Sequence, residues 1–481
     1  MKRSVSSVLC IALFVLCLAF SLSSCKEDPV KEINSLEGKD RAAALLSYID
    51  KVECDSYTVD STAELSLQTA PKSTTTVRTK QVGVFEFEGS ALKARRTDTE
   101  TTTTVKSADP VVSRQTVAYA DGKLSIVDKD AGVGIFSQAT PEAAEKFFDL
   151  TKVSDLSLDD IKNIACDYTA GEGWTLTLSG LSGKTLGTFS KAVGAIDGST
   201  NSYLADVSLV IKVSEDFMPE NISAEYIFEG TLASAYIPTM TMEMAFRDIG
   251  SSKVEVDLAG CIEVPDISIL KKLGDTLDEL KLAKKGAFTA SVSTVTKIAN
   301  FGVLYTETDD VSFSRKNGKF SYLVSSMTSE QVNLRTEYSD GEQKKTKKSL
   351  LSSSSSSSNP TTTKQTDMGA KAFIYGLADP GNFNMYNIRL IELKRSGDNR
   401  AVYELMVAKP DSSLFSASLR ELDVNKDSVK YSATVTVVTV NGEISGYTYT
   451  CTCSGKTKDG KNKFSITVTS RLSDFCYSSE N

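Results

Sequence analysis

Alternation of apolar and polar residues with a period of two runs through long stretches of the chain. The segment "YLADVSLVIKV" has this pattern, and "YSATVTVVTV" has it again in the C-terminal half. Period two over this length predicts half-buried antiparallel strands, and the doubled Val437-Val438 predicts a β-bulge. The predicted buried faces are Ala205, Val207, Leu209, Ile211 and Val213 in the first strand, and Ala433, Val435 and Val437 in the second.

The two strands belong to a longer internal repeat. In each copy an extended strand, starting at Trp174 or at Val402, precedes a polar turn and a short helical piece, predicted at 186–196 or 414–422. After the alternating strand comes a further strand that opens with Ile-Ser and ends on Gly, "ISAEYIFEG" or "ISGYTYTCTCSG". Matching order and spacing in two copies predict a duplicated domain, because a solenoid needs three or more repeats.

Upstream of this repeat, each half is predicted to be a meander of long strands with short inserted helices. "GVFEFEG" and "QTVAYADGKLSIVD" correspond to "SFSRKNGKFSYLV" and "VNLRTEYSDGEQKK". Asp121-Gly122 and Asn317-Gly318 are two-residue hairpin signals. Helices are predicted at Lys39–Val52, Pro141–Leu150 and Ser157–Ala165, the last with Ser157 as its N-cap and Asp159 and Asp160 in its first turn.

Two segments indicate how the chain divides into domains. Residues 266–286 have the apolar spacing of an amphipathic helix, interrupted at Gly274, and we place a connecting helix there. The first domain then covers 38–265 and the second 287–481. Within the second, 349–367 is predicted to be a disordered loop, because its serine tract has no apolar residue to bury. The adjoining Lys344, Lys345, Lys347 and Lys348 are interpreted as part of a solvated loop.

The N-terminus has the features of a secretory signal. Lys2 and Arg3 precede the apolar run 9–20, which is shorter than the roughly 20 residues of a membrane-spanning helix. The run ends at Leu22-Ser23-Ser24-Cys25, which resembles the bacterial lipobox. That resemblance implies cleavage of residues 1–24 and lipidation of Cys25, whose acyl chains would tether the protein without spanning the membrane. The alternative is an ordinary cleaved signal with a chance cysteine.

Residues 25–37 form the predicted tether. Its Lys26-Glu27-Asp28 resembles the short acidic signal of surface-exported lipoproteins of the Bacteroidota, and the alternative is a solvated leash, so the side of the membrane stays open. Removing Lys2 and Arg3 with the signal takes the net charge from −8 to −10. This acidic balance argues against a nucleic-acid partner, because phosphate binding needs a basic footprint.

Catalytic chemistry is easier to exclude than to find. The chain has no histidine, which removes Ser-His-Asp and Cys-His nucleophiles and His-liganded zinc. Among 62 acidic residues no carboxylate pair stands out for glycosidase chemistry. The sequence therefore predicts no enzyme, no metal and no cofactor, and it names no ligand-binding residue.

Three local motifs have alternative readings as sites. Trp174, the only tryptophan, is predicted to lie in the core and not on a carbohydrate platform. Residues 180–185 look superficially like a phosphate loop, but Leu178 stands where its first glycine is required, so we read a hairpin connection. Residues 423–428 space oxygen ligands like a calcium loop but lack the glycine at its sixth position, which favours a turn.

Six cysteines beyond Cys25 allow fifteen pairings as three disulfides, and the sequence does not choose among them. Cys451 and Cys453 share one face of a strand, and either could reach Cys476. Buried free thiols are the favoured reading because the two copies do not share cysteine positions. The six are Cys54, Cys166, Cys261, Cys451, Cys453 and Cys476.

The leading helix, the long meandering strands and the inserted helices behind a lipid anchor resemble the LolA-like and LppX-like half-barrel lipoproteins, here in tandem. This resemblance implies an α+β fold with two strongly curved antiparallel sheets (half-barrels) and short inserted helices. It also implies an apolar cavity for acyl chains in each half-barrel.

Two functions follow as hypotheses. The first is a lipid-anchored protein of the bacterial cell envelope, on its periplasmic face or at the cell surface, that binds a lipid or other hydrophobic ligand in the cavity. The second is a structural or adhesive lipoprotein whose sheets are filled by their own side chains and whose Thr/Ser-rich outer faces meet envelope proteins. An open cavity would distinguish the first from the second.

Overall fold

Two compact units, divided between Glu263 and Val264, make up the described part of the chain. We call them the first and the second unit. The computed structural model describes residues 29–49, 54–70, 73–89, 91–105, 108–148, 156–183, 185–187, 189, 202–230, 237–282, 287–298, 302–316, 319–328, 332–339, 341–349, 360–364, 383–397, 399–410, 412–415, 419 and 422–476.

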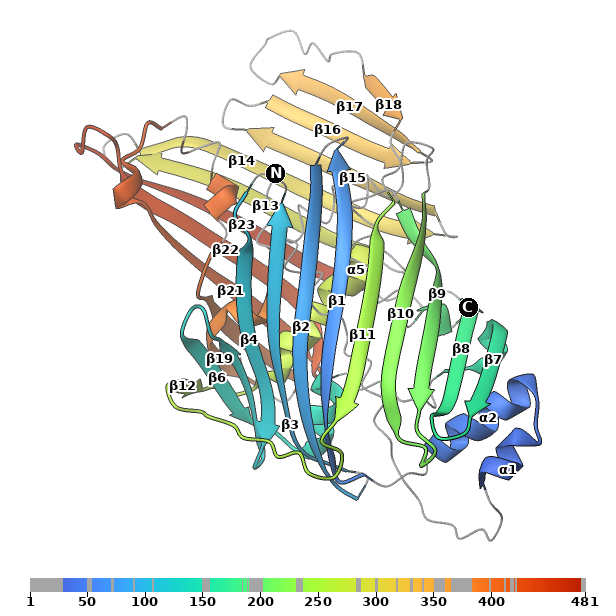
Figure 1. Cartoon of the computed structure of the whole chain (residues 1–481). Coiled ribbons are helices and arrows are strands. Elements are labelled where there is room, and N and C mark those ends of the chain that lie inside the picture. The colour runs from blue at the N-terminus through green and yellow to red at the C-terminus, as the bar shows by residue number, and fades with distance from the viewer. Residues whose placement is uncertain are drawn as a thin grey trace. The chain divides into compact units, whose positions relative to one another are not determined.

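The first unit is built on one 12-stranded sheet with the order β12-β6-β5-β4-β3-β2-β1-β11-β10-β9-β8-β7. Neighbours pair antiparallel except β12, which adds to β6 in parallel. The long strands β1 and β2 run side by side in blue in Figure 1. The strands are β1 (Ser56–Ala70), β2 (Ser73–Glu88), β3 (Ala91–Val105), β4 (Val111–Ala120), β5 (Lys123–Asp128), β6 (Val133–Gln138), β7 (Ile161–Thr169), β8 (Gly173–Leu181), β9 (Ser202–Val213), β10 (Pro219–Gly230), β11 (Thr239–Arg247) and β12 (Cys261–Glu263).

The second unit holds an 11-stranded antiparallel sheet with the order β18-β17-β16-β15-β14-β13-β23-β22-β21-β20-β19. Strand for strand this is the order of the first sheet without β12, so the repeat seen in the sequence extends over the whole sheet. The strands are β13 (Ala287–Ile298), β14 (Gly302–Lys316), β15 (Lys319–Thr328), β16 (Val332–Ser339), β17 (Glu342–Ser349), β18 (Thr361–Lys364), β19 (Ile388–Ser396), β20 (Arg400–Val407), β21 (Lys430–Val440), β22 (Glu443–Lys456) and β23 (Lys463–Cys476).

The predicted α+β class is wrong: the described residues are mostly β, and neither sheet closes. Strands of up to 16 residues take up most of the described part of the chain, while α1 (Pro29–Asn34), α2 (Gly38–Ile49) and α3 (Pro141–Phe148) are short. A period of 3.6 over two turns is a weak signal beside alternation over a whole strand, so helices are a small part of the described structure.

The predicted helix at Ser157–Ala165 is also wrong. Only Leu158–Asp160 turns, as a 3-10 helix, and β7 begins at Ile161. The side chain of Ser157 makes no capping hydrogen bond. Strand pairing of Ile161 with Leu181 wins over the local helix signal, because the sheet buries apolar side chains that an isolated helical turn would leave in water.

Two other predicted helices are present. The prediction at Lys39–Val52 corresponds to α2 and that at Pro141–Leu150 to α3, although residues 50–52 and 149–150 lie outside the described part. Of the helical pieces predicted at 186–196 and 414–422, much also lies outside it; Ser412–Phe415 is a 3-10 turn.

Helix α5 (Ser268–Leu282) opens the second unit and runs through Gly274 without a break. One glycine inside a helix costs only about 1 kcal/mol relative to alanine. Burial of Leu270, Leu273 and Leu277 along one side of the helix offsets that cost. The predicted interruption at Gly274 is therefore wrong.

Two-residue turns join several antiparallel neighbours. Asp121 and Gly122 both have positive φ, of 50° and 71°, between the paired Ala120 and Lys123, as the hairpin signal predicted. Asn441-Gly442 forms the same kind of turn between β21 and β22, with φ of 52° and 81°. The predicted turn Asn317-Gly318 lies outside the described residues.

The alternating strands are found, with one shift of face. Val207, Leu209, Ile211 and Val213 are buried, but a register shift between Ile227 and Phe228 of β10 skips Ala205, and Leu204 is buried in its place. On β21 the predicted face Ala433, Val435 and Val437 is buried. The predicted irregularity follows Val438, but the unmatched residue is Ser445 on the partner strand β22.

The lysine-rich segment that was interpreted as a solvated loop is a strand. Lys344 pairs with Glu337 and Lys345 with Thr336, as part of β17. Thr361–Lys364, inside the predicted disordered loop, forms β18 along the first half of β17. Residues 350–359 and 365–367 lie outside the described part.

Candidate functional site

The lipidation site predicted at Cys25 and the acidic signal after it lie outside the described residues. The first described element, α1, begins at Pro29. Ile33 of α1 is completely buried in the core of the first unit. The chain is therefore anchored to the folded unit only a few residues after the predicted point of lipid attachment.

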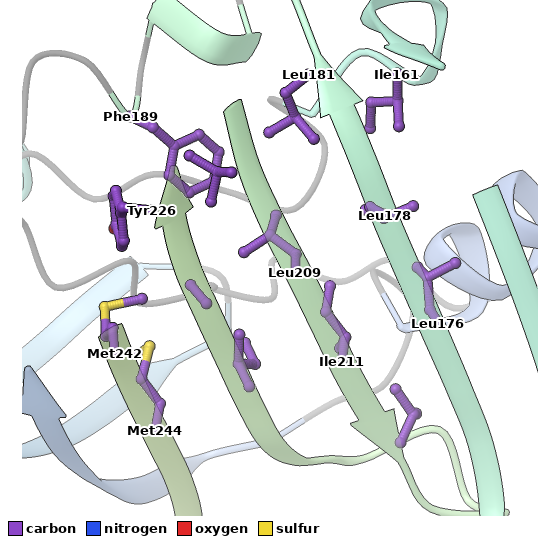
Figure 2. Close-up of a cluster of buried hydrophobic side chains, with 14 of the residues drawn as sticks. Ile161, Leu176, Leu178, Leu181, Phe189, Leu209, Ile211, Tyr226, Met242 and Met244 are labelled. Carbon is purple, nitrogen blue, oxygen red and sulfur yellow. The ribbon is translucent and has the colours of Figure 1, made fainter. Parts of the chain in front are cut away.

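The candidate ligand face is the apolar inner face of the first sheet. Strict alternation on β11 aims Met240, Met242 and Met244 to this side, while Thr241 and Glu243 face outward. The side chains of β8, β9 and β10 continue the face without a break. Figure 2 shows them gathered on one side of the strands: Leu176, Leu178, Leu181, Leu209, Ile211 and Tyr226.

The inner face is covered by other parts of the same unit. Leu45, Leu46 and Ile49 of α2 belong to the same buried cluster. The rings of Phe189 and Tyr226 pack edge to face, with their centroids 6.1 Å apart. Figure 2 shows the two side chains next to each other. The face residues keep at most 8% of their surface exposed, so the chain itself supplies the atoms that a ligand would otherwise provide.

At one end of the face, aromatic rings close the core. Trp174 is buried, as predicted, and lies 4.7 Å from the ring of Tyr168. Phe217, in the turn before β10, stacks on Tyr48 of α2 at 5.1 Å. Phe217 has a positive φ of 61°, which a non-glycine residue adopts only when its packing compensates the strain.

Two polar atoms inside this core have no hydrogen-bond partner, Nε1 of Trp174 and the hydroxyl of Tyr226. Burial raises the pKa of the Tyr226 hydroxyl far above its usual range, so it stays neutral. Beside it lie methionines, whose flexible side chains adapt to different neighbours. Among the described side chains next to these methionines, the Tyr226 hydroxyl is the buried polar group without a hydrogen-bond partner.

The donors of the segment that looks like a phosphate loop are bound by two carboxylates of the chain. Asp160 accepts hydrogen bonds from the backbone N–H and the hydroxyl of Thr185, at 3.1 and 3.3 Å. Asp206 accepts from the N–H groups of Gly180 and Leu181 at 2.9 and 2.7 Å. These donors already bind carboxylates of the chain, so they are not available to bind a phosphate. The segment is a connection between β8 and β9.

The segment that looks like a calcium loop is a turn. Asn425 accepts a hydrogen bond from the N–H of Asp427 at 3.1 Å and so caps a 3-10 turn over Lys426–Ser428. Within the described ranges, no three acidic, cysteine or histidine side chains come close enough to hold a metal ion.

No disulfide joins the five cysteines whose side chains are described: Cys54, Cys166, Cys451 and Cys453 are buried and Cys261 is half-buried. Burial raises the pKa of Cys166 and of Cys453 to about 11, the latter with help from neighbouring Cys451. Such thiols are unreactive near neutral pH. Cys451 lies opposite Val468, about 26 Å along β23 from Cys476, so the pairing considered from the sequence does not form.

A partly buried network of charged side chains lies on the outer face of the first sheet. The sequence pattern did not predict it. The carboxylate of Asp98 accepts hydrogen bonds from Thr116 and Lys129, both at 2.6 Å, and from Arg96 at 2.8 Å. Burial alone would raise the pKa of Asp98, but these three donors outweigh it and lower the pKa below its usual range. Arg96 also reaches the carbonyl of Glu255 at 2.9 Å, which holds the segment before β12 against the sheet.

Comparison with known proteins gives no family. No family model matches the chain, and no curated protein matches it. Similar solved structures include the translocator domain of the autotransporter NalP from Neisseria meningitidis, which is 8% identical over 93% of this chain and 96% of that chain, with a TM-score of 0.12. A DUF3598-family protein of unknown function from Nostoc punctiforme is 8% identical over 86% and 94%, with a TM-score of 0.12. A putative AttH from Nitrosomonas europaea is 7% identical over 86% and 92%, with a TM-score of 0.13. Scores at this level do not define a shared fold.

Among the described residues, no helix combines the length and the apolar character needed to span a membrane.

Proposed function

We propose that this protein is a lipid-anchored lipoprotein of the bacterial cell envelope that acts as a non-catalytic interaction module. It is attached through Cys25, and it presents the outer faces of its two sheets to envelope partners. The signal and the lipobox-like Leu22-Ser23-Ser24-Cys25 support the anchor. The absence of histidine from the sequence supports a role other than catalysis.

The observation that carries the choice between the two hypotheses is the packed inner face of the first sheet. A carrier of acyl chains needs apolar volume that its own side chains leave open. Here the apolar side chains of β8–β11 form one cluster with α2 and Phe189, and each is nearly or completely buried. This packing favours an interaction module over a carrier.

The outer faces suit contacts with proteins. On β3 the outward residues Arg96, Asp98 and Glu100 alternate with inward ones, and four threonines follow before the strand ends at Val105. Hydroxyl and charged groups on a rigid sheet offer hydrogen-bonding positions at low entropic cost, because the backbone is already fixed.

A specific observation keeps hydrophobic ligand binding as the second candidate. The unpartnered hydroxyl of Tyr226, beside Met240 and Met242, would donate a hydrogen bond to the carbonyl oxygen of an acyl ligand. Methionine side chains could adjust to admit such a chain.

Native mass spectrometry of the mature chain, produced in bacterial periplasm with Cys25→Ser, tests the choice. We expect the mass of the bare polypeptide, unchanged after incubation with membrane lipids. A lipid that co-purifies at fixed stoichiometry, and that is lost or weakened in Tyr226→Phe, would establish the second candidate in place of the interaction module. Tyr168→Phe is the matched control. It removes an exposed hydroxyl that donates to Glu215 and does not face Met240 or Met242.

A further inference from the structure

One end of the second unit's sheet carries a dense group of lysines. β22 ends at Lys456, β23 begins at its partner Lys463, and Lys458 and Lys461 lie in the turn between them. On the neighbouring segment, Lys426 lies in the turn before β21 and Lys430 is the first residue of β21. All six side chains are exposed, and we call this group the lysine end: Lys426, Lys430, Lys456, Lys458, Lys461 and Lys463.

Backbone contacts hold the two segments of the lysine end together. Val424 and Thr457 form an isolated β-bridge. The N–H of Asn425 donates to the carbonyl of Lys456 at 3.0 Å, and the N–H of Lys458 donates to the carbonyl of Asp423 at 2.9 Å. The six lysines therefore belong to one continuous surface and not to two independent loops.

The lysine end reverses the charge of the chain locally. Its six lysines stand with three acidic residues, Asp423, Asp427 and Asp459, which leaves a surplus of three positive charges on a chain whose net charge is −8. Asp459 accepts hydrogen bonds from the Thr457 hydroxyl at 2.5 Å and from the Lys461 N–H at 3.1 Å. These bonds lower the pKa of Asp459 and fix the turn that displays the lysines.

The composition of the surface indicates the kind of partner. Lysine acts as a hydrated point charge, whereas arginine is the residue that recognises a single phosphate or carboxylate bidentately. The lysine end contains no arginine and spreads its charges over the β22–β23 turn and the strand ends beside it. That arrangement fits a diffuse, extended layer of negative charge.

We propose that the lysine end docks on the head groups of anionic phospholipids and so holds the second unit against the membrane. The proposal rests on the proposed function, because the lipid at Cys25 would keep this surface near a bilayer. Each lysine close to an anionic bilayer strengthens binding roughly fivefold, and the attraction decays within a Debye length.

The experiment is flotation with lipid vesicles, using the mature chain with Cys25→Ser so that no acyl chain contributes. The vesicles contain either phosphatidylcholine alone or phosphatidylcholine with about 30% phosphatidylglycerol. We expect binding to the anionic vesicles only, with a strong loss when the salt concentration rises from about 0.05 to 0.5 M.

Two variants with equal changes of net charge separate a site from overall charge. The first combines Lys456→Glu, Lys458→Glu, Lys461→Glu and Lys463→Glu, and should bind anionic vesicles at least about 100-fold more weakly. The control combines Lys80→Glu, Lys162→Glu, Lys212→Glu and Lys253→Glu, four exposed lysines of the first unit, and should keep most of the binding. Circular dichroism melting verifies that both variants are folded.

Three results would overturn the proposal: no flotation of the unsubstituted chain at low salt, equal losses in the two variants, or binding to an acidic polysaccharide or acidic protein with none to vesicles. Because the Cys25→Ser variant carries no lipid, none of these three results would contradict the proposed lipidation of Cys25. Failure of lipidation would appear instead in acyl labelling of the unmodified chain.

Discussion

At the scale of single residues, hydrogen bonds between side chains of neighbouring strands stabilise the outer face of the first sheet. Asp98 is the clearest case, since three donors converge on its carboxylate at the outer face of β3. No sequence motif announces this network, because its members come from β3, β4 and the turn after β5 and meet only through strand register.

Asp98→Asn should destabilise the first unit by about 1–2 kcal/mol at pH 7, because the neutral amide loses the charge-assisted hydrogen bonds. The expected loss is no larger because the network is partly exposed and solvent screens its charges. The folded pKa of Asp98 lies below its ordinary value of 3.8. The carboxylate therefore contributes fully above that ordinary pKa, and its contribution is lost as the pH falls through the lower folded value. Urea denaturation from pH 7 to pH 2 should show the two proteins converging in acid. Exposed Asp109→Asn should change stability by less than about 0.5 kcal/mol at every pH, and a constant difference for Asp98→Asn would contradict this account.

At the scale of elements, close backbone approaches fix where strands begin. β8 starts at Gly173, which has a φ of +88° directly after the turn from β7. A Cβ at this position would lie 2.2 Å from the carbonyl oxygen of Val213. The adjacent β9 therefore leaves room only for glycine.

Gly173→Ala should cost about 3 kcal/mol or more, because the clash is with backbone atoms and the left-handed conformation adds strain. Gly171→Ala is the matched comparison: it has a similar φ of +82° but nothing within 4 Å of the added Cβ. It should cost only about 1 kcal/mol. Thermal or urea unfolding of both variants measures the difference, and equal losses would mean that strain alone, without the clash, decides the position.

At the scale of the whole molecule, the two sheets share one strand order although their sequences match only in part. The same strand connectivity gives both sheets the same strand order, although the side chains on corresponding strands differ. β12 is an addition to the first sheet, where it pairs in parallel with β6 and covers that edge. The second sheet ends instead at the short, fully exposed strand β18.

The predicted anchor is also a property of the whole molecule. Metabolic labelling with a palmitate analogue in the producing bacterium should label the wild-type protein and send it to the membrane fraction. Cys25→Ser should remove the label and release the protein, because its remaining contacts with the membrane are electrostatic and sensitive to salt. Cys17→Ser, within the cleaved signal, should leave both unchanged. Labelling that survives Cys25→Ser would contradict lipidation at this residue.

The sequence alone determined the long alternating strands, the repeat and the predicted anchor, because alternation, turn residues and an N-terminal signal are local properties. It identified the faces of β9 and β21 nearly residue by residue, and the turn at Asp121-Gly122. It did not predict the strand at Ile161–Thr169, the continuity of α5 through Gly274 or the strand β17, since in each case partners distant in sequence outweigh local preference. Only the tertiary structure decided that the apolar inner face is filled by the chain's own α2 and Phe189, and that lysines from two segments meet at one end of a sheet. Packing and the convergence of charges depend on which strands become neighbours, and no local pattern encodes that.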